Sequence, residues 1–352
     1  MQQSSIMHRN IMVILWMAVS LFFLMIFPVS AAPNLTKVAE SSSQWTGIAI
    51  SRDGRIFVNY PTWNDYPKGY RVAELVHGVA RPYPNEAVNK EFVCVQSVIT
   101  DDKNHLWILD PAKLKGQDVA PTGARLYEVD LNTDELCRVY VFSSSVALPQ
   151  SYLNDVRIDT KRQMAYVTDS GLGGIIVLDL KTGNSWRALS DIPEVKANLT
   201  GIDFVSTGRF THVSQSDGIE LSGDGRRLYF TALGGTILYS ISTDVLRDTS
   251  RTIADRQKHI IVVNPHNVAT DGMILKGDCL YMADLAKEKI WEYDLKTGIG
   301  RDLALPEPVR WADSFASAPD GSIYFTTSEI NYAKAERQPY GLYKLTLDTK
   351  KE

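Results

Sequence analysis

The feature that most constrains the fold of this chain is a sequence unit that recurs six times. Each copy has a polar residue, a small residue or second acid, a short alternating apolar run, a polar turn, and a run rich in aromatic and β-branched residues. The six copies begin at Thr46, Gln96, Asn154, Asp217, Asp271 and Asp313, at intervals of 50, 58, 63, 54 and 42 residues. Repeats with periods of this size are typical of solenoids and propellers.

The alternation of apolar and polar residues within each unit predicts β-strands, two per copy. A third strand and a turn follow several copies, and the sequence "DLKTG" closes two of them, at 179–183 and 294–298. Four strands in each of six units predict an all-β, six-bladed β-propeller. Helical periodicity over more than about two turns is almost absent after residue 31, which argues against an α/β barrel.

The last copy has only three strands before the sequence ends. We expect "NLTKVAES" (34–41) to pair with "YGLYKLTL" (340–347) and supply the fourth strand of the last blade. This pairing would close the ring and cover sheet edges that otherwise invite association. Residues 32–352 are therefore predicted to be one propeller domain.

Residues 1–31 have the pattern of a signal peptide, with a basic start, an apolar stretch at 11–27 and the small residues Val29 and Ala31. They predict a secreted or periplasmic protein without membrane attachment after cleavage; a retained anchor is the alternative. The formal net charge is −4, and no run of Lys and Arg is present. Nucleic acid and anionic membranes are therefore poor candidates as partners. A monomer is expected.

Three cysteines, Cys94, Cys137 and Cys279, are an odd number without the spacing of a metal site. Cys94 and Cys137 fall on the inner and outer sides of one predicted blade, too far apart for a disulfide. Cys279 belongs to another blade. All three are expected to be free.

The six first residues of the copies are expected to face one axial pocket, because the inner strand of each blade begins beside the central channel. They are the predicted ligand-binding residues. Asp217-Gly218 therefore belongs to a ring, whereas Asp224-Gly225 lies between two apolar runs and predicts a hairpin turn. Three acids close together either hold protons or surround a cation.

Oxygen donors without His or Cys favour Ca²⁺, Mg²⁺ or Mn²⁺ as a cofactor. Asn154, Asp217 and Asp271 are the predicted metal ligands; the alternative is a wet channel mouth with no cofactor. His212 and His266 lie in loops that lead to the pocket. The aromatic residues of "WADSF" (311–315) are expected to pack between blades, with ligand stacking as the alternative. No nucleophile elbow or phosphate loop is present in the sequence.

Several segments resemble the major royal jelly protein/yellow family, in its bacterial branch. They are "YPTW" (60–63), "RPYPNE" (81–86), "VQSVITDDKNHLWILDPA" (95–112), "YLNDVRID" (152–159), "AYVTDSGLGGIIVLDLKTG" (165–183) and "WADSFASAPDGSIYFTTSEIN" (311–331). The resemblance spans about Trp45 to Leu347 and implies a secreted six-bladed propeller. Insect members include proteins associated with dopachrome conversion and salivary proteins that bind biogenic amines in the channel. It therefore implies that this chain binds a small molecule there.

A more distant similarity is to the senescence marker protein/gluconolactonase family, whose six-bladed members bind a divalent metal through a Glu, two Asn and an Asp. By position, Asn154 matches the first Asn and Asp217 replaces the second. Asp271 matches the Asp, which implies a catalytic base. Thr46 stands where that family has its Glu, a departure from its metal site.

Two classes of function remain open at this point. One is a protein that binds a small molecule in the channel. The other is an enzyme, either a lactone hydrolase in which a metal polarises the carbonyl and Asp271 activates water, or a dopachrome-type isomerase. A metal in the pocket would favour the hydrolase. A metal-free acidic pocket lined by Trp or Tyr would favour amine binding through ion pairing and cation–π contacts.

Overall fold

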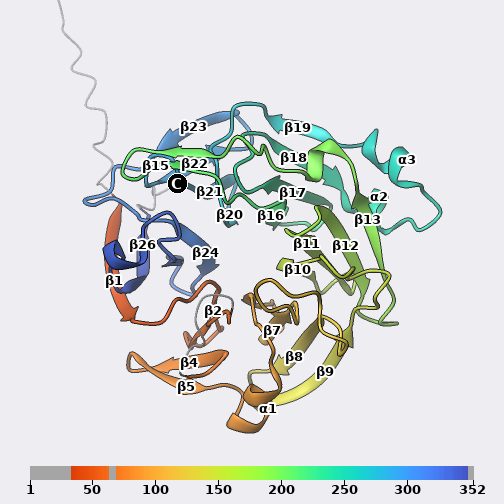
Figure 1. The fold of residues 1–352 in the computed structure, drawn as a ribbon, viewed down its shortest axis with the longest axis horizontal. Coiled ribbons are helices and arrows are strands. Elements are labelled where there is room, and N and C mark those ends of the chain that lie inside the picture. Colours follow the sequence, from red (N-terminus) through yellow and green to blue (C-terminus); the bar gives the residue numbers. More distant parts are fainter. Residues whose placement is uncertain (1–32, 63–68, 348–352) are drawn as a thin grey trace, which may run out of the picture.

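Residues 33–62 and 69–347, which the computed structural model describes, form six four-stranded antiparallel sheets arranged around a central axis (Figure 1). The predicted six-bladed propeller is confirmed. The predicted signal peptide, residues 1–31, lies outside the described residues. Among the residues described, no helix is long and apolar enough to cross a membrane.

The first three blades follow the chain from the axis outwards. Blade 1 comprises β2 (Ile48–Ile50), β3 (Ile56–Asn59), β4 (Val72–Val76) and β5 (Val79–Pro82). Blade 2 comprises β6 (Ser97–Thr100), β7 (His105–Asp110), β8 (Arg125–Asp130) and β9 (Glu135–Val141). Blade 3 comprises β10 (Leu153–Asp159), β11 (Met164–Asp169), β12 (Gly174–Asp179) and β13 (Ser185–Ser190).

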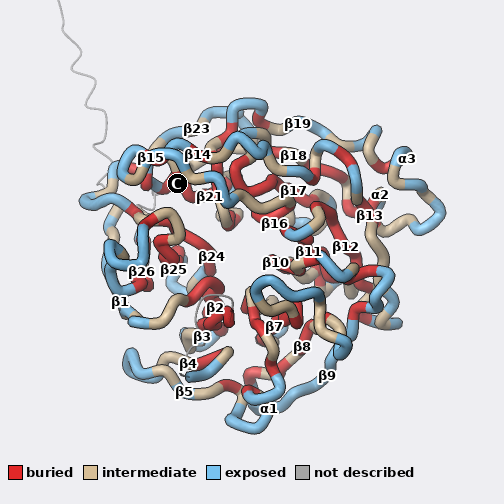
Figure 2. Tube along the Cα trace, in the orientation of Figure 1, coloured by how far each residue is buried: buried red, intermediate tan, exposed pale blue. Residues whose placement is uncertain are grey.

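The next two blades have the same order. Blade 4 comprises β16 (Ser216–Leu221), β17 (Arg227–Ala232), β18 (Leu238–Ser242) and β19 (Ile261–Asn264). Blade 5 comprises β20 (Met273–Lys276), β21 (Cys279–Asp284), β22 (Lys289–Asp294) and β23 (Ile299–Asp302). The inner strands are largely buried and the outer strands are more exposed, except β13, which is intermediate to buried (Figure 2).

The N-terminal strand closes the ring, as predicted. Blade 6 comprises β24 (Ala312–Ser317), β25 (Ile323–Thr327), β26 (Tyr340–Thr346) and, outermost, β1 (Asn34–Ser41). The register of β1 on β26 runs from Asn34 opposite Thr346 to Ser41 opposite Tyr340, with a bulge between Lys37 and Ala39. The two ends of the described chain are thus held in one sheet.

Helices are few and short in the described part of the chain. They are α1 (Glu86–Glu91), α2 (Thr243–Arg247), α3 (Ile253–Gln257) and the 3-10 turns at Pro193–Val195 and Lys334–Glu336. One element lies outside the repeat pattern. A two-stranded hairpin, β14 (Ile202–Phe204) and β15 (Gly208–Phe210), is inserted between blades 3 and 4.

The two Asp-Gly pairs of residues 217–225 have different structures, as predicted. Gly225 has φ +68° in the turn between β16 and β17, where Asp224 accepts hydrogen bonds from the Ser222 hydroxyl and the Arg226 amide. Asp217 and Gly218 lie within β16. Only the second pair is therefore a turn.

Candidate ligand-binding site

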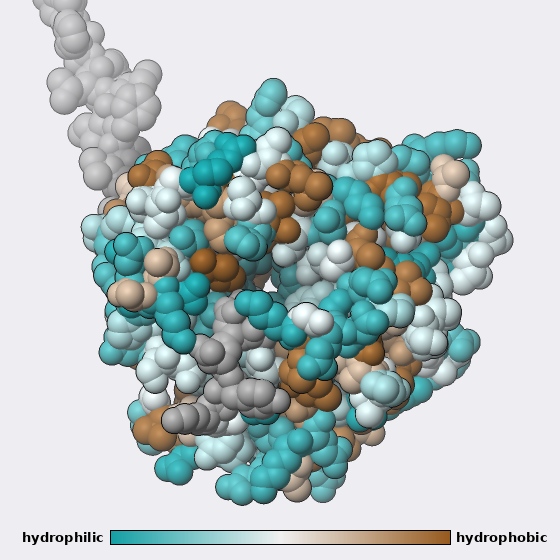
Figure 3. All heavy atoms as spheres, in the orientation of Figure 1, coloured by the Kyte–Doolittle hydropathy of each residue, from teal (hydrophilic) through white to brown (hydrophobic). Residues whose placement is uncertain are grey.

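A cavity of about 300 Å³ lies where the inner strands converge, on the axis of the ring. Figure 3 shows the molecule hollowed at the centre of the ring. The lining residues are Gln96, Tyr152, Asn154, Ser170, Phe210, His212, Ser214, Asp217, Leu233, Asp271, Trp311, Asp313 and Ile330. Five of the six residues that begin the sequence repeats are among them, so the structure brings these five together.

Local backbone irregularities place three of these side chains. The pairing of the first two strands shifts register between Leu153 and Val156 in blade 3 and between Ser216 and Ile219 in blade 4. Blade 6 has the same shift just after Ala312. Asn154, Asp217 and Asp313 each lie within such a shift. Bulges re-aim side chains and interrupt pairing, which is why these polar residues turn towards the axis instead of into the sheet.

The small residue after the ring position allows neighbouring blades to approach. A Cβ atom on Gly218 would lie 2.5 Å from the carbonyl oxygen of Asp271, and one on Gly272 would lie 2.3 Å from that of Asp313. The Gly272 amide donates to this Asp313 oxygen at 2.8 Å. The Asp-Gly sequence thus has a packing role here, and it brings the three aspartates together.

The aspartates form an acidic cluster with perturbed protonation. Burial raises the pKa of Asp217, Asp271 and Asp313 well above the usual range of a carboxyl group. Asp217 and Asp271 hydrogen bond to each other, and this bond lowers the pKa of Asp217 and raises that of Asp271. The charge of Asp271 also raises the pKa of Asp313. The raised pKa values of both groups indicate that the pair holds a proton.

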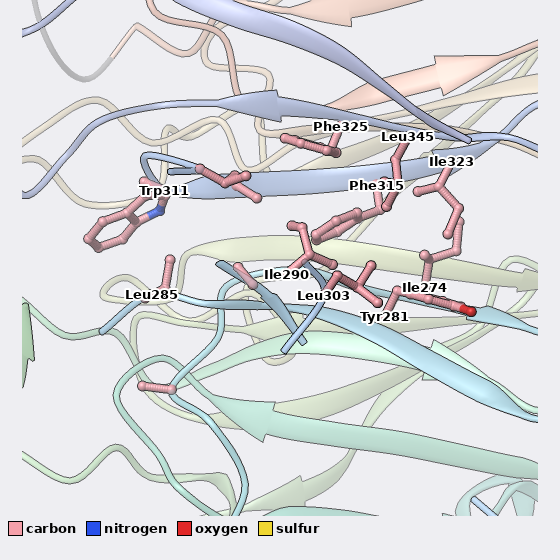
Figure 4. Packing of buried hydrophobic residues seen from close by; sticks show 14 of the residues in the cluster. Ile274, Tyr281, Leu285, Ile290, Leu303, Trp311, Phe315, Ile323, Phe325 and Leu345 are labelled. Atoms are coloured by element: carbon pink, nitrogen blue, oxygen red, sulfur yellow. The ribbon is translucent and has the colours of Figure 1, made fainter. Parts of the chain in front are cut away.

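Trp311 links the acidic cluster to the aromatic part of the cavity. Its indole Nε1 donates a 2.7 Å hydrogen bond to Oδ2 of Asp271. Its ring is stacked on Phe204, with centroids 5.5 Å apart at 11°, and meets Phe210 edge-on at 5.1 Å. Figure 4 shows Trp311 at one end of the packed interface between blades 5 and 6, with Leu285 close to it. The prediction that Trp311 packs between blades is confirmed. Trp311 is also one of the residues that line the cavity.

Tyr152 and His212 complete the wall. The Tyr152 hydroxyl donates to Oε1 of Gln96 at 2.7 Å, and burial raises the pKa of Tyr152 well above its usual value. His212 follows β15 and lies 5.7 Å from Phe210, measured between ring centroids. The position of His212 near the pocket was predicted from the sequence, whereas those of Tyr152 and Phe210 were not. Tyr152 and Trp311 precede Asn154 and Asp313 by two residues, which is the signal that could have identified them.

Thr46 and His266 were also predicted to lie at or near the pocket, but neither is among the described residues that line this cavity. Thr46 is buried in blade 1, where its hydroxyl donates to the Gln96 carbonyl and accepts from Nδ2 of Asn59, both at 2.9 Å. The hydroxyl is thus satisfied within the protein. The amide of His266, in the loop before blade 5, donates to Oδ1 of Asn264 at 3.0 Å.

A buried ionic network lies next to the cavity. Arg157 on β10 pairs with Asp155 at 3.0 Å and with Glu220 at 3.3 Å, and it donates to the Met273 carbonyl at 2.9 Å. These contacts join blades 3, 4 and 5. The charge of Asp155 also raises the pKa of Asp217, Asp271 and Asp313. No Lys or Arg is among the described residues that line the cavity.

The predicted metal ligands fit a divalent ion poorly. Within residues 33–62 and 69–347, no group of three or more His, Cys, Asp and Glu side chains is arranged to hold a metal. Oδ2 of Asp271 already accepts the Trp311 N–H, and Asp217 is hydrogen bonded to Asp271. Ca²⁺ requires six to eight oxygen ligands. The raised pKa values of these carboxyl groups favour protonation as the way to balance their charge.

All three cysteines are free, as predicted. Cys94 is buried beside the cavity wall, with its sulfur 3.7 Å from the Tyr152 hydroxyl. Cys137 is exposed on β9, and Cys279 is partly buried on β21.

The fold and site define a six-bladed β-propeller with an acidic and aromatic axial cavity. The chain belongs to the major royal jelly protein family, whose model matches residues 93–296. It is 27% identical over 228 residues to protein yellow of Drosophila subobscura, covering 56% of this chain and 39% of that protein. It is 28% identical over 229 residues to protein yellow of Drosophila melanogaster, covering 56% and 41%. The chain therefore spans about two fifths of the length of these relatives.

Solved structures share the fold at low sequence identity. A calcium-binding protein, regucalcin, from Agrobacterium tumefaciens aligns with a TM-score of 0.58 and 15% identity, covering 91% of this chain and 94% of that one. A gluconolactonase from Xanthomonas campestris aligns with a TM-score of 0.57 and 12% identity, covering 90% of each chain. At these identities the likeness concerns the fold alone.

Proposed function

We propose that this protein binds a small organic cation, an amine with an apolar or aromatic body, in the axial cavity. The observation that carries the proposal is the cluster of Asp217, Asp271 and Asp313 beside the ring of Trp311. A carboxylate in a buried site pairs strongly with an ammonium group. The partly exposed rings of Tyr152 and Phe210 also line the cavity and add cation–π attraction and apolar contact.

Protonation of the empty site follows from the same geometry. The raised pKa values mean that the buried carboxyl groups hold protons when nothing compensates their charge. An ammonium group favours the ionised form, so its entry displaces a proton from the shared pair. We also propose that the protein is exported, because residues 1–31 have the pattern of a signal peptide. A monomeric state and a place in the bacterial branch of the family are further parts of the proposal; the second rests on the sequence resemblance.

The experiment is a comparison of a cation with a neutral molecule of the same shape. Phenethylamine and propylbenzene share a ring and a chain but differ in charge. By calorimetry or competition at neutral pH, the amine should bind at least about tenfold more tightly, since a tenfold ratio corresponds to only about 1.4 kcal/mol. Equal affinities for the two molecules would show that the acidic cluster does not recognise the positive charge of the ligand.

One observation favours a second candidate, an isomerase of the dopachrome type. Two carboxyl groups that share a proton can take a proton from one atom of a substrate and return it to another. Asp217 and Asp271 are such a pair. Turnover of a dopachrome-like substrate that is abolished in Asp271→Asn would support it. The metal-dependent lactone hydrolase has less support, because the carboxyl groups of Asp217 and Asp271 are already hydrogen bonded within the protein.

A further inference from the structure

The inserted hairpin extends away from the blades to which it is connected. It follows blade 3 and precedes blade 4, yet it reaches across to blade 5 (Figure 1). There the amide of Val205, at the hairpin tip, donates to the carbonyl of Ala286 at 2.9 Å. Among the described strands, β14 and β15 pair only with each other. The hairpin is therefore not part of any blade.

A small polar latch holds the hairpin tip. The Ser206 hydroxyl donates to Oε1 of Glu288 at 2.5 Å, and the Tyr332 hydroxyl donates to the same oxygen at 2.6 Å. Nδ2 of Asn331 donates to the Thr207 hydroxyl at 3.0 Å. Glu288 belongs to blade 5, whereas Asn331 and Tyr332 belong to blade 6. The tip thus bridges two blades that are distant from it in sequence.

The underside of the hairpin is apolar and covers the indole at the cavity. Phe204 is 4% exposed and stacks on Trp311, and Ile202 packs in the same cluster as Leu285. The upper side is open to solvent, since Val205 is 74% exposed. One apolar face and a few hydrogen bonds make up the contact.

The same segment forms part of the cavity wall. Phe210 ends β15, and His212 and Ser214 follow it; all three line the cavity. The hairpin is therefore continuous with the wall on this side of the cavity. It also fixes the position of Trp311, whose N–H is bound to Asp271.

We propose that the β14–β15 hairpin is a lid over the axial cavity, which undocks from blades 5 and 6 to admit a ligand and docks to hold Trp311 against Asp271. Segments with few contacts open more easily than the sheets around them, and lids of this kind govern entry and release. The inference concerns access to the cavity of the proposed function, but its test requires no ligand.

The test places a thiol inside the cavity and measures its access to solvent. Ser170 lines the cavity and is only 9% exposed, so Ser170→Cys provides a small, nearly isosteric probe. Labelling by neutral methyl methanethiosulfonate is followed at this position by peptide mass spectrometry, which separates it from the native cysteines. The latch is weakened by Ser206→Ala with Tyr332→Phe. The matched control is Tyr281→Phe, which removes a 2.8 Å bond from a tyrosine to Glu292 elsewhere in blade 5.

Loss of two latch hydrogen bonds should raise the labelling rate about tenfold, whereas Tyr281→Phe should leave it unchanged. Equal rates in the two variants would overturn the lid. Hydrogen exchange in the unmodified protein gives a second measurement, independent of whether a variant folds. The amides of 202–210 should exchange faster than those of β16. Equal protection of the two segments would also overturn the lid, whether or not an amine binds.

Discussion

The indole N–H of Trp311 donates a 2.7 Å hydrogen bond to Oδ2 of Asp271, and this bond joins the aromatic wall of the cavity to its acidic cluster. Trp311 has φ +54°, a left-handed conformation that is uncommon for a bulky residue, and it is fully buried. Backbone strain of this kind persists where the surroundings fix a residue, and it is concentrated at functional sites.

Replacement of Trp311 by Phe tests this link. The change keeps an aromatic ring but removes the donor to Asp271, so the pKa of Asp271 should rise further. Ionisation on amine binding becomes harder, and the affinity should fall about fivefold, the equivalent of one hydrogen bond of about 1 kcal/mol. Trp291→Phe is the control, because the Trp291 Nε1 has no hydrogen-bond partner. Similar affinities in both variants would show that the bond does not contribute.

Gly218 and Gly223 lie five residues apart, but only Gly218 is in a tightly packed place. An added Cβ at Gly218 would lie 2.5 Å from the Asp271 carbonyl, whereas one at Gly223 meets nothing within 4 Å. Gly218→Ala should therefore lower the free energy of unfolding by about 1–3 kcal/mol, and Gly223→Ala should change it little. Denaturant titration measures both. A stable Gly218→Ala variant would mean that blades 4 and 5 can separate locally.

The acidic cluster should make stability depend on pH. In the folded state the raised pKa values of Asp217 and Asp271 keep a proton bound to the pair, whereas in the unfolded chain both carboxyl groups lose their protons near pH 4. Stability contributed by this pair is therefore present below that pH and is lost as pH rises towards the folded pKa. Asp217→Asn should remove part of this loss, flatten the decline in stability above about pH 4, and weaken amine binding at least about tenfold.

Asp224→Asn is the matched control in the same stretch. Hydrogen bonds from Ser222 and Arg226 lower the pKa of Asp224, so any stability it contributes is lost as pH falls. Its turn accepts Asn-Gly as well as Asp-Gly. If the two variants have the same pH dependence and the same affinity for the amine, the ring of aspartates has no special role.

Deletion of residues 32–42 tests the closure of the ring. This segment contains β1, the outer strand of blade 6. Its loss exposes the edge of β26 and should lower the melting temperature by roughly 5–10 °C and promote association. An unchanged melting temperature in a monomeric variant would show that three strands suffice for the last blade.

The blades and most of the acidic cluster could be predicted from the sequence, because each repeat carries the same local pattern of strand, turn and polar residue. Asp217 and Asp271 were found by their place in that pattern. The lid was not. The sequence of residues 206–216 is mostly polar and does not indicate the strand at Gly208–Phe210, because short strands that pair only with each other have little periodicity. Phe210 reaches the cavity through contacts with blades that are distant in sequence.

The proton balance of amine binding tests the central claim most directly. The measurement is calorimetry of phenethylamine binding at one pH in two buffers with different ionisation enthalpies. If the buried pair of Asp217 and Asp271 exchanges its shared proton for the ammonium group, about one proton should be released per amine, and the affinity should increase with pH. Binding without proton release, or with an affinity independent of pH, would contradict the account.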